Sequence, residues 1–205
     1  MTYRGFTVWD AEPNAINDPK DSARRSLQRL DPGTGRIAVV DRSGVQTVEF
    51  ESLPFLFTRA EVITFRAFLA QCKGRLNPFW VPTWQRDFRL YADAHAGESA
   101  LQILPSGYSR FAFSTVARRD FVVMMLDRSA KYCHRITAAS WDGGPFETLT
   151  LETPLEHDFN DSTALVCYLK FVRLAADDTG ETKWETTEVA SAVLSYASLP
   201  QEVPA

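Results

Sequence analysis

The sequence predicts a mainly β protein, an antiparallel β-sandwich or barrel-like domain with one amphipathic α-helix and an extended N-terminal arm. Three observations lead to this prediction. Short strand-like segments recur from residue 36 onward, each bounded by Gly, Pro, Asp or Ser. One segment, 58–74, has the apolar spacing of a helix. The 205 residues include 14 Phe and 5 Trp, and aromatic side chains favour strands and interfaces.

Residues 1–35 are expected to form the extended N-terminal arm, in which only a stretch around 22–30 could be helical. Proline and glycine interrupt the arm at Pro13, Pro19, Pro32, Gly33 and Gly35. Its apolar residues include Phe6, Val8 and Trp9, which follow no helical or strand period. We therefore expect these three side chains to rest on a neighbouring subunit or on the chain's own domain, which makes them candidate interface residues.

Residues 36–205 are expected to form the β-rich domain, which a split near 92–107 would divide into two subdomains. A β-hairpin is predicted first, because an apolar run from Arg36 leads into a turn at 41–44 and then into alternating residues. Further strands are predicted over 87–93, 100–105, 110–116, 120–127, 131–141, 147–153, 164–178 and 182–200. Many short strands at this spacing are typical of sandwiches and barrels.

The helix over 58–74 has the clearest local signals. Thr58 and Glu61 have the spacing of a capping box, in which each side chain satisfies a free backbone amide of the first turn. An apolar stripe follows at intervals of three and four residues, and it consists of Val62, Phe65, Leu69 and Cys72. Gly74 is the expected residue just past the end of the helix. We predict that this is the only long helix.

The helix is followed by an aromatic segment, residues 77–84, which reads NPFWVPTW. Pro78 and Pro82 lack the amide hydrogen that a central strand needs, so the segment is predicted to be an edge strand or an extended connection. Its rings could form a core plug against the helix, a subunit contact or a ligand cleft. Phe79 is expected in the core, and Trp80 and Trp84 are candidate interface residues, because tryptophan is favoured at interface centres.

The sequence offers no set of metal ligands. Among the His and Cys residues only Cys133 and His134 are adjacent, and neighbouring residues of a strand face opposite ways. The three cysteines are fewer than an iron–sulfur cluster normally takes, and their odd number fits reduced thiols. We therefore expect no metal and no other cofactor.

The sequence also lacks the motifs of common enzyme classes. It contains no phosphate loop, nucleophile elbow or dinucleotide fingerprint. The glycine-containing segments 31–35 and 106–111 are predicted turns. Glu147, Glu152 and Glu156 could serve as a glycosidase pair by position, but they could equally belong to a solvated strand face. We expect a protein that is not an enzyme.

The charge and hydropathy of the chain exclude some partners. The net charge is −4 and no basic patch stands out, so specific nucleic-acid binding is not expected. No apolar run reaches the ~18 residues of a membrane span, and the first residues lack the pattern of a secretory signal. A cytoplasmic setting without membrane association is expected.

Three phrases of the sequence resemble tail-tip proteins of long-tailed bacteriophages and prophages, of the distal tail protein kind. The phrases are VWDAEPN in the arm, FLFTRAEVITFRAFLAQCKGRLNPFWVPTWQRD around the helix, and YLKFVRLAADDTGETKWETTEVASAVLSYASLP near the end. Within the last phrase, residues 170–174 and 184–200 match the shape of the family's closing segment. These are packing motifs and carry no catalytic residue.

The resemblance implies a structural virion protein at the tail tip, assembled in the host cytoplasm. In this family a ring of subunits, commonly a hexamer, joins the tail tube to the hub or baseplate. The implied partners are further copies of the chain, the tube protein and hub or baseplate proteins. DNA passes through the lumen, and a mildly acidic lining would repel its phosphates.

Two other functions remain open at this point. A carbohydrate-binding β-sandwich of a tail tip would use Trp80, Trp84 or Trp141 to stack on sugar rings. A cell-wall hydrolase would need paired carboxylates. Solvent exposure of those tryptophans would favour the first alternative.

Overall fold

The chain is mainly β with antiparallel pairing, as predicted. The computed structural model describes residues 1–13, 20–24, 27–30, 38–41, 47–52, 55–56, 58–125, 130–177, 182–184, 190–199 and 202–204. Among the described strands, no sheet closes into a barrel. The chain divides into two compact units: unit 1 holds Met1–Asp10 and Trp80–Lys170, and unit 2 holds Ala11–Phe79 and Phe171–Pro204.

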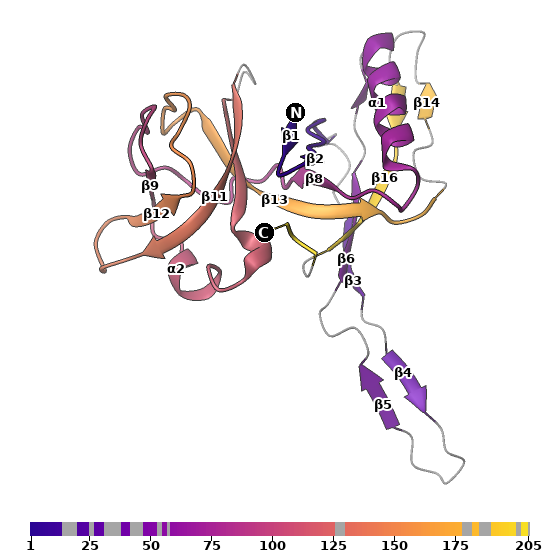
Figure 1. Cartoon of the computed structure of the whole chain (residues 1–205), viewed down its shortest axis with the longest axis horizontal. Helices are drawn as coiled ribbons and strands as arrows, with labels where there is room; N and C mark the ends of the chain where they lie inside the picture. Colours follow the sequence, from indigo (N-terminus) through magenta and orange to yellow (C-terminus); the bar gives the residue numbers. More distant parts are fainter. Residues whose placement is uncertain are drawn as a thin grey trace. The chain divides into compact units, whose positions relative to one another are not determined.

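Unit 1 is built on an antiparallel sheet in which the strands follow the order β13, β10, β11, β12 and β9 (Figure 1). Its elements are β1 (Thr2–Tyr3), β2 (Phe6–Thr7), β9 (Ala100–Ile103), α2 (Tyr108–Phe111), β10 (Asp120–Met125), β11 (Lys131–Ser140), β12 (Glu147–Leu151) and β13 (Ala164–Leu174). Strand β13 pairs through Phe121↔Tyr168 with β10 in this unit. A 3₁₀ turn, Val116–Arg118, leads into β10.

The core of unit 1 lies on one face of this sheet. Alternate residues of the strands point into it, as the two-residue period of a strand requires. The cluster of buried side chains consists of Phe88, Leu90, Ala94, Leu101, Ile103, Tyr108, Ala112, Phe121, Val123, Ile136, Leu149, Leu151, Leu155, Phe159, Ala164 and Val166. Phe88 meets Tyr108 and Phe121 edge to face, with ring centroids 5.1 and 6.2 Å apart.

Unit 2 combines short antiparallel sheets with the long helix. Its elements are β3 (Lys20–Arg24), β4 (Leu27–Leu30), β5 (Ala38–Asp41), β6 (Thr47–Ser52), β7 (Phe55–Leu56), α1 (Arg59–Cys72), β14 (Thr182–Trp184), β15 (Ala190–Ala192) and β16 (Leu194–Ser198). Strand β16 pairs with β6 on one side and with the end of β13 on the other. Strand β15 lies between β14 and β7.

The predicted helix is confirmed as α1, Arg59–Cys72, and it is the only long helix in the described part of the chain. Both bonds of the capping box are present: Glu61 N–H donates to Thr58 Oγ1 at 3.1 Å, and Thr58 N–H donates to Glu61 Oε2 at 3.2 Å. Of the predicted stripe, Val62, Phe65 and Cys72 are buried and Leu69 is partly buried, while the neighbouring Phe68 is buried with them. The chain turns left-handed at Lys73 (φ 50°), one residue before Gly74.

The predicted aromatic plug forms a short strand, β8 (Phe79–Pro82), all four residues of which are buried. Strand β8 pairs with β13, and Pro82 stands at its end, where a missing amide costs least. Phe79 is a core residue, as expected. Its ring meets Phe68 of α1 edge to face at 4.9 Å and Tyr196 of β16 at 6.4 Å.

The predicted hairpin between the strands near 36–41 and 45–50 is wrong, and so is the helical reading of 22–30. Strand β6 pairs with β3 and strand β5 pairs with β4, so neither of the two predicted strands pairs with the other. Residues 31–37 lie outside the described residues, as does the turn predicted at 41–44 apart from Asp41. The pairing of β4 with β5 crosses the boundary that was expected between 1–35 and 36–205.

Two of the later strand predictions are also wrong. Residues 110–116 do not form a strand, because α2 ends at Phe111 and the 3₁₀ turn starts at Val116. This also corrects the turn predicted at 106–111. Residues 87–93 make only the isolated bridges Phe88↔Val166 and Leu90↔Ile103. The strand predictions over 100–105, 120–127, 131–141 and 147–153 are confirmed as β9, β10, β11 and β12.

Candidate functional site

The first ten residues form a tight hairpin that covers Trp80 within unit 1. Strands β1 and β2 are joined by Arg4 and Gly5, both with positive φ (48° and 81°), as a two-residue hairpin turn requires. The indole Nε1–H of Trp80 donates to the carbonyl of Tyr3 at 3.2 Å, and the two rings meet edge to face at 5.5 Å. Trp9 N–H donates to the carbonyl of Trp80 at 2.8 Å.

The structure brings most of the candidate interface residues together around this indole. Val8 forms a parallel bridge with Trp80, and the exposed fractions of Val8, Trp9 and Trp80 are 3%, 8% and 1%. Val8 and Trp9 therefore rest on their own domain, which was one of the two arrangements expected for them, and Trp80 is covered within the same unit. Phe6 and Trp84 are only partly buried, so they keep surface that a partner could contact.

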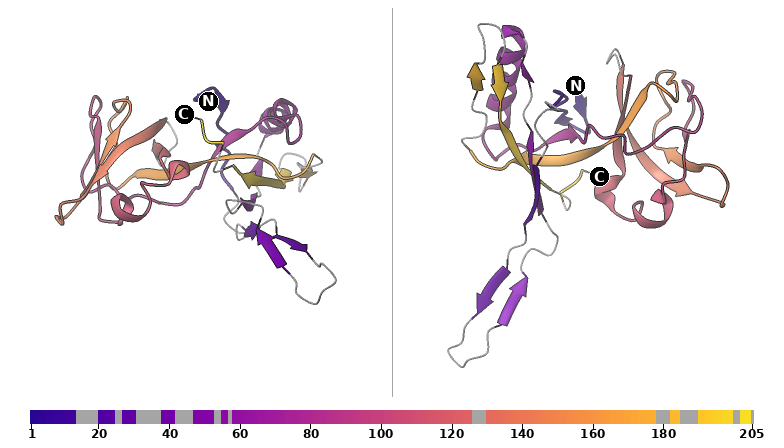
Figure 2. Two further views of the ribbon diagram at one scale, coloured as in Figure 1. Left: turned by 60° about the horizontal axis from the view of Figure 1, so that its bottom comes forward. Right: turned by 180° about the vertical axis from the view of Figure 1, so that it is seen from behind.

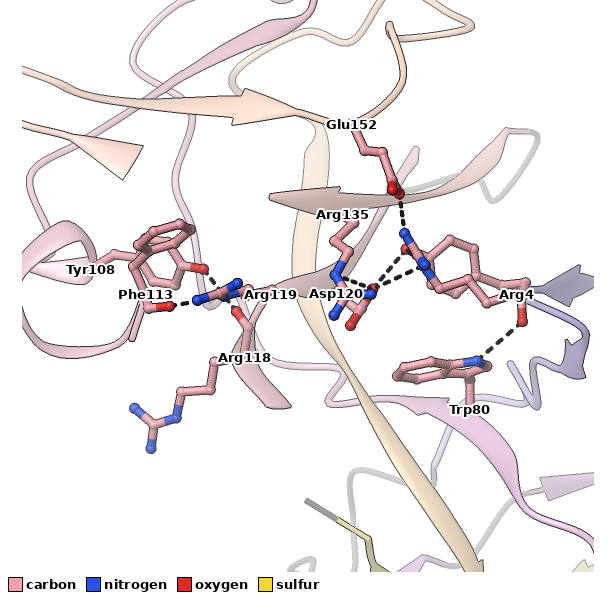
Figure 3. A network of polar contacts seen from close by, with 10 residues as sticks. Arg4, Trp80, Tyr108, Phe113, Arg118, Arg119, Asp120, Arg135 and Glu152 are labelled. Atoms are coloured by element: carbon pink, nitrogen blue, oxygen red, sulfur yellow. Dashed lines mark hydrogen bonds and ion pairs between the residues drawn. The ribbon is translucent and has the colours of Figure 1, made fainter. Parts of the chain in front are cut away.

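A buried carboxylate, Asp120, lies beside Arg4 of the same hairpin (Figure 3). Tyr3 Oη–H donates to Asp120 Oδ1 at 2.8 Å. The Nε atoms of Arg4 and Arg135 lie 3.6 and 3.9 Å from the same oxygen. Arg4 also pairs with Glu152. One turn residue of the N-terminal hairpin is thus tied to strand β10 and to the end of β12.

The Asp120 side chain is fully buried, and its second oxygen, Oδ2, has no hydrogen-bond partner among the described residues. Burial raises the pKa of Asp120 above its ordinary value, while the Tyr3 hydroxyl and the guanidinium groups of Arg135 and Arg4 act in the opposite direction. Burial also raises the pKa of Tyr3. The carboxylate thus ties Tyr3 and Arg4 of the N-terminal hairpin to Arg135 of β11. We call this arrangement the Asp120 clamp.

A second buried carboxylate, Glu147, fixes the short helix α2. Its Oε1 accepts from the amides of Ser106 and Gly107 at 3.2 and 2.6 Å, and its Oε2 accepts from Ser109 at 3.4 Å. Gly107 adopts a left-handed conformation (φ 75°). Tyr108, the first helical residue, is buried and donates its hydroxyl to the carbonyl of Arg118 at 2.9 Å. These contacts all fix the N-terminal end of the one-turn helix.

Several large side chains around α2 are exposed although their backbone is well anchored. We call this surface the α2 face, and it consists of Leu104, Arg110, Phe111, Val116, Arg118 and Trp141. The exposed fractions are 80% for Phe111 and 37% for Trp141. The Trp141 indole is fixed by donating to the carbonyl of Gly144 at 2.9 Å, and the Arg110 guanidinium lies 5.4 Å from its ring. The α2 face is thus an ordered surface of aromatic and cationic groups.

The histidine and cysteine side chains of the described chain do not converge on a metal site. No group of three or more His, Cys, Asp or Glu within the described ranges could hold a metal ion. Cys133 and Cys167 flank Val122 on two neighbouring strands, and burial raises the pKa of each thiol to about 12. His134 is buried against Thr153 Oγ1 at 3.2 Å, and burial lowers its pKa.

Sequence reasoning missed Asp120 and its partners. Tyr3 and Asp120 are separated by 117 positions, and no local pattern joins them. The available signals were a charged residue at the head of the apolar run DFVVMM and the Arg-Gly pair of a two-residue turn. The α2 face was missed except for Trp141, because residues 110–116 were assigned to a strand.

No protein-family model matches the chain, and no curated protein sequence matches it at a significant level. Within the described part of the chain, no helix combines the length and the apolar character that crossing a membrane would take.

Proposed function

We propose that this chain is a structural virion protein of a phage tail tip, of the distal tail protein type. Copies of the chain form a ring that joins the tail tube to the hub or baseplate, with DNA passing through the lumen. In this proposal the chain carries no catalytic site and no cofactor, and its work is assembly. Its place is the virion, after assembly in the host cytoplasm.

The observation that carries the proposal is how two of the three phrases that resemble this family pack in unit 2. Phe68 belongs to the helix, Phe79 to the aromatic segment and Tyr196 to the closing segment. Phe79 contacts both of the other rings, at 4.9 and 6.4 Å. The resemblance therefore rests on segments that form one packing unit, since residues 68 and 196 are joined through the ring at 79.

The pairing of β4 and β5 supports an assembly role. Within the described residues, these two strands pair only with each other. A two-stranded ribbon is marginally stable alone in water, and its edges carry unpaired backbone groups that can accept a further strand or chain. In a ring, a neighbouring subunit would supply this further strand or chain.

Electron microscopy of the purified protein tests the proposal. Negatively stained particles should show closed rings of one size, and sedimentation should give a mass that is a whole multiple of 23.1 kDa. Six copies are expected from the resemblance. Mixing with tail-tube protein should place the ring at one end of the tube. Particles that remain single subunits in both preparations would contradict the proposal.

One observation favours the carbohydrate-binding alternative. Trp80 is buried and cannot stack on a sugar, but Trp141 is 37% exposed and its indole is held in place. If this alternative is correct, bacterial wall polysaccharide will quench tryptophan fluorescence, and Trp141→Ala will abolish the quenching. An unchanged signal in the wild-type protein would remove this alternative.

A further inference from the structure

The α2 face is basic in a chain whose net charge is −4. Residues 104–119 contain Arg110, Arg118 and Arg119 and no Asp or Glu. The next residue, Asp120, is buried, and the exposed carboxylate beside the face is that of Asp142, which follows Trp141. Arginine and aromatic side chains are the groups that are enriched at the centres of protein interfaces.

The Arg118 side chain is available to a partner. Figure 3 shows it pointing away from the Asp120 network, while only its backbone carbonyl serves Tyr108. The Phe111 ring folds against Gly107, where an added Cβ would lie 3.1 Å from it. The Phe111 ring and the Arg110 guanidinium, which lies 5.4 Å from the Trp141 ring, are thus held in place and lose little conformational entropy when a partner binds.

A second surface of unit 1 has the opposite charge. We call it the acidic loops, and it consists of residues 91–99 and 152–162. The loops lie side by side, since Ala94 and Phe159 exchange backbone hydrogen bonds of 2.9 and 2.8 Å. Neither range contains Lys or Arg. Their carboxylates are those of Asp93, Glu98, Glu152, Glu156, Asp158 and Asp161.

Some of these carboxylates serve the loops themselves, and others face solvent. Glu98, Asp158 and Asp93 accept from the amides of residues 95, 96 and 161, and Glu152 pairs with Arg4. Arg86, which lies outside the loops, donates to the carbonyl of Ser162 at 3.5 Å, and within the loops His95 Nδ1 lies 3.7 Å from Asp158 Oδ1. Glu156 and Asp161 are exposed, and within the described residues their carboxylates make no hydrogen bond or ion pair.

The two surfaces lie at opposite ends of the same strands. Strands β9 and β12 pair through Thr150↔Ala100 next to the acidic loops and through Glu147↔Ile103 next to α2. Figure 1 shows α2 at one end of these strands and the loops at the other, and both views in Figure 2 keep this arrangement. A surface and its complement at opposite ends cannot meet within one copy of unit 1.

We propose that the α2 face of one copy binds the acidic loops of the next copy, in a head-to-tail contact. Contacts of this kind form a ring when the rotation between neighbours closes. The inference rests on the proposed function and adds to it the two surfaces that build the ring. Opposite charges set the register of the contact, and Phe111 and Trp141 supply its apolar centre.

Charge reversal tests the contact in the full chain. One variant carries Arg110→Glu and Arg118→Glu, and the second carries Glu156→Lys and Asp161→Lys. Sedimentation velocity should show that each variant alone associates about tenfold more weakly or worse than wild type. An equimolar mixture should restore a ring in which the two variants alternate. The reversed α2 face of the first variant then meets the reversed loops of the second, and the unchanged α2 face of the second meets the unchanged loops of the first. Circular dichroism should show that both variants are folded.

The matched control reverses two exposed charges elsewhere, with Arg59→Glu and Arg66→Glu on α1, and it should associate like wild type. A wild-type ring that neither reversal weakens would overturn the contact and leave the proposed ring intact. Loss of association in both variants without rescue by mixing would also overturn it. A wild-type chain that stays monomeric up to about 100 µM would overturn both the ring and the contact.

Discussion

At the scale of single residues, the burial of Trp80 favours a core role over an interface role. Its exposed fraction is 1%, and its Nε1–H donates to Tyr3. Trp80→Ala should therefore lower the free energy of unfolding by about 3–5 kcal/mol, because a large buried side chain leaves a cavity. Urea denaturation measures this. Trp184→Ala, at a tryptophan that is 45% exposed, is the matched control and should change stability far less. Normal stability of Trp80→Ala with lost self-association would instead mark an interface residue.

The raised pKa of Asp120 predicts how its contribution to stability depends on pH. In the unfolded chain an aspartate has a pKa of about 3.9, and burial places the folded value higher. Between the two values the folded state binds more protons than the unfolded state. The stability that comes from protonation of Asp120 in the folded state is therefore fully present below the unfolded pKa. It is lost as the pH rises through the folded pKa.

Asp120→Asn tests this dependence, because asparagine does not titrate. The difference in the free energy of unfolding, wild type minus variant, should be largest near the unfolded pKa of Asp120. It should fall as the pH rises toward the folded pKa. Urea denaturation at a series of pH values measures the difference, and Asp161→Asn controls for the loss of a surface charge. A difference that grows with pH would show that the cationic partners Arg4 and Arg135 outweigh burial.

The Asp120 clamp also shows why this part of the site could not be predicted. Its members lie at residues 3, 4, 120, 135 and 152. Each is ordinary in its local context, and only the tertiary fold brings them together. The burial of Val8 and Trp9 was predictable from their apolar character, but the sequence could not say whether their own chain or a neighbour covers them.

At the scale of elements, the capping box of α1 gives the most local prediction. Thr58→Ala should lower the free energy of unfolding by about 1 kcal/mol, because the amide of Glu61 loses its acceptor. Thermal or urea denaturation checks this value. Thr58→Ser keeps the hydroxyl and should stay close to wild type. If serine costs as much as alanine, the threonine methyl group matters more than the cap.

The β4–β5 ribbon can be removed without disturbing the strands at its base. Arg24 pairs with Thr47, so replacing residues 25–46 with Asn-Gly would close β3 and β6 with a two-residue turn. If the ribbon rests on a neighbouring subunit, the shortened chain should keep its circular dichroism spectrum and lose self-association in sedimentation. Gly-Gly in place of Asn-Gly controls for the turn. A shortened chain that forms rings as stable as wild type would deny the ribbon this role.

The helix could be predicted because its signals lie within a few residues of one another, whereas strand partners could not. The alternation around Val45 to Phe50 correctly indicates a strand. It does not say whether that strand pairs with residues 38–41 or with 20–24, and the structure has the second arrangement. Phe111 and Phe113 also alternate like strand residues. Yet the distant Glu147 binds the amides that begin a helical turn there.

At the scale of the whole molecule, we expect the first ten residues to stabilise the fold of their own chain, whether or not they also contact a neighbouring subunit. Deleting residues 1–10 removes Val8 and Trp9 from the Trp80 site and leaves Asp120 without Tyr3 and Arg4. We expect a loss of about 3 kcal/mol or more in the free energy of unfolding. Denaturation and sedimentation of the two chains measure both effects. A truncated chain of wild-type stability that no longer associates would make this segment an arm for a neighbour.

The interruption of unit 2 by unit 1 has a consequence for biosynthesis. Unit 2 needs residues 11–79 and 171–204, so the ribosome makes its first part long before its second. Strand β6 must wait for β16, which pairs Ser52 with Leu194. Meanwhile residues 80–170 can emerge and fold with the waiting N-terminal hairpin. The nascent chain therefore carries one finished unit and one open sheet edge, and an open edge of this kind is a substrate for chaperones and a risk for aggregation.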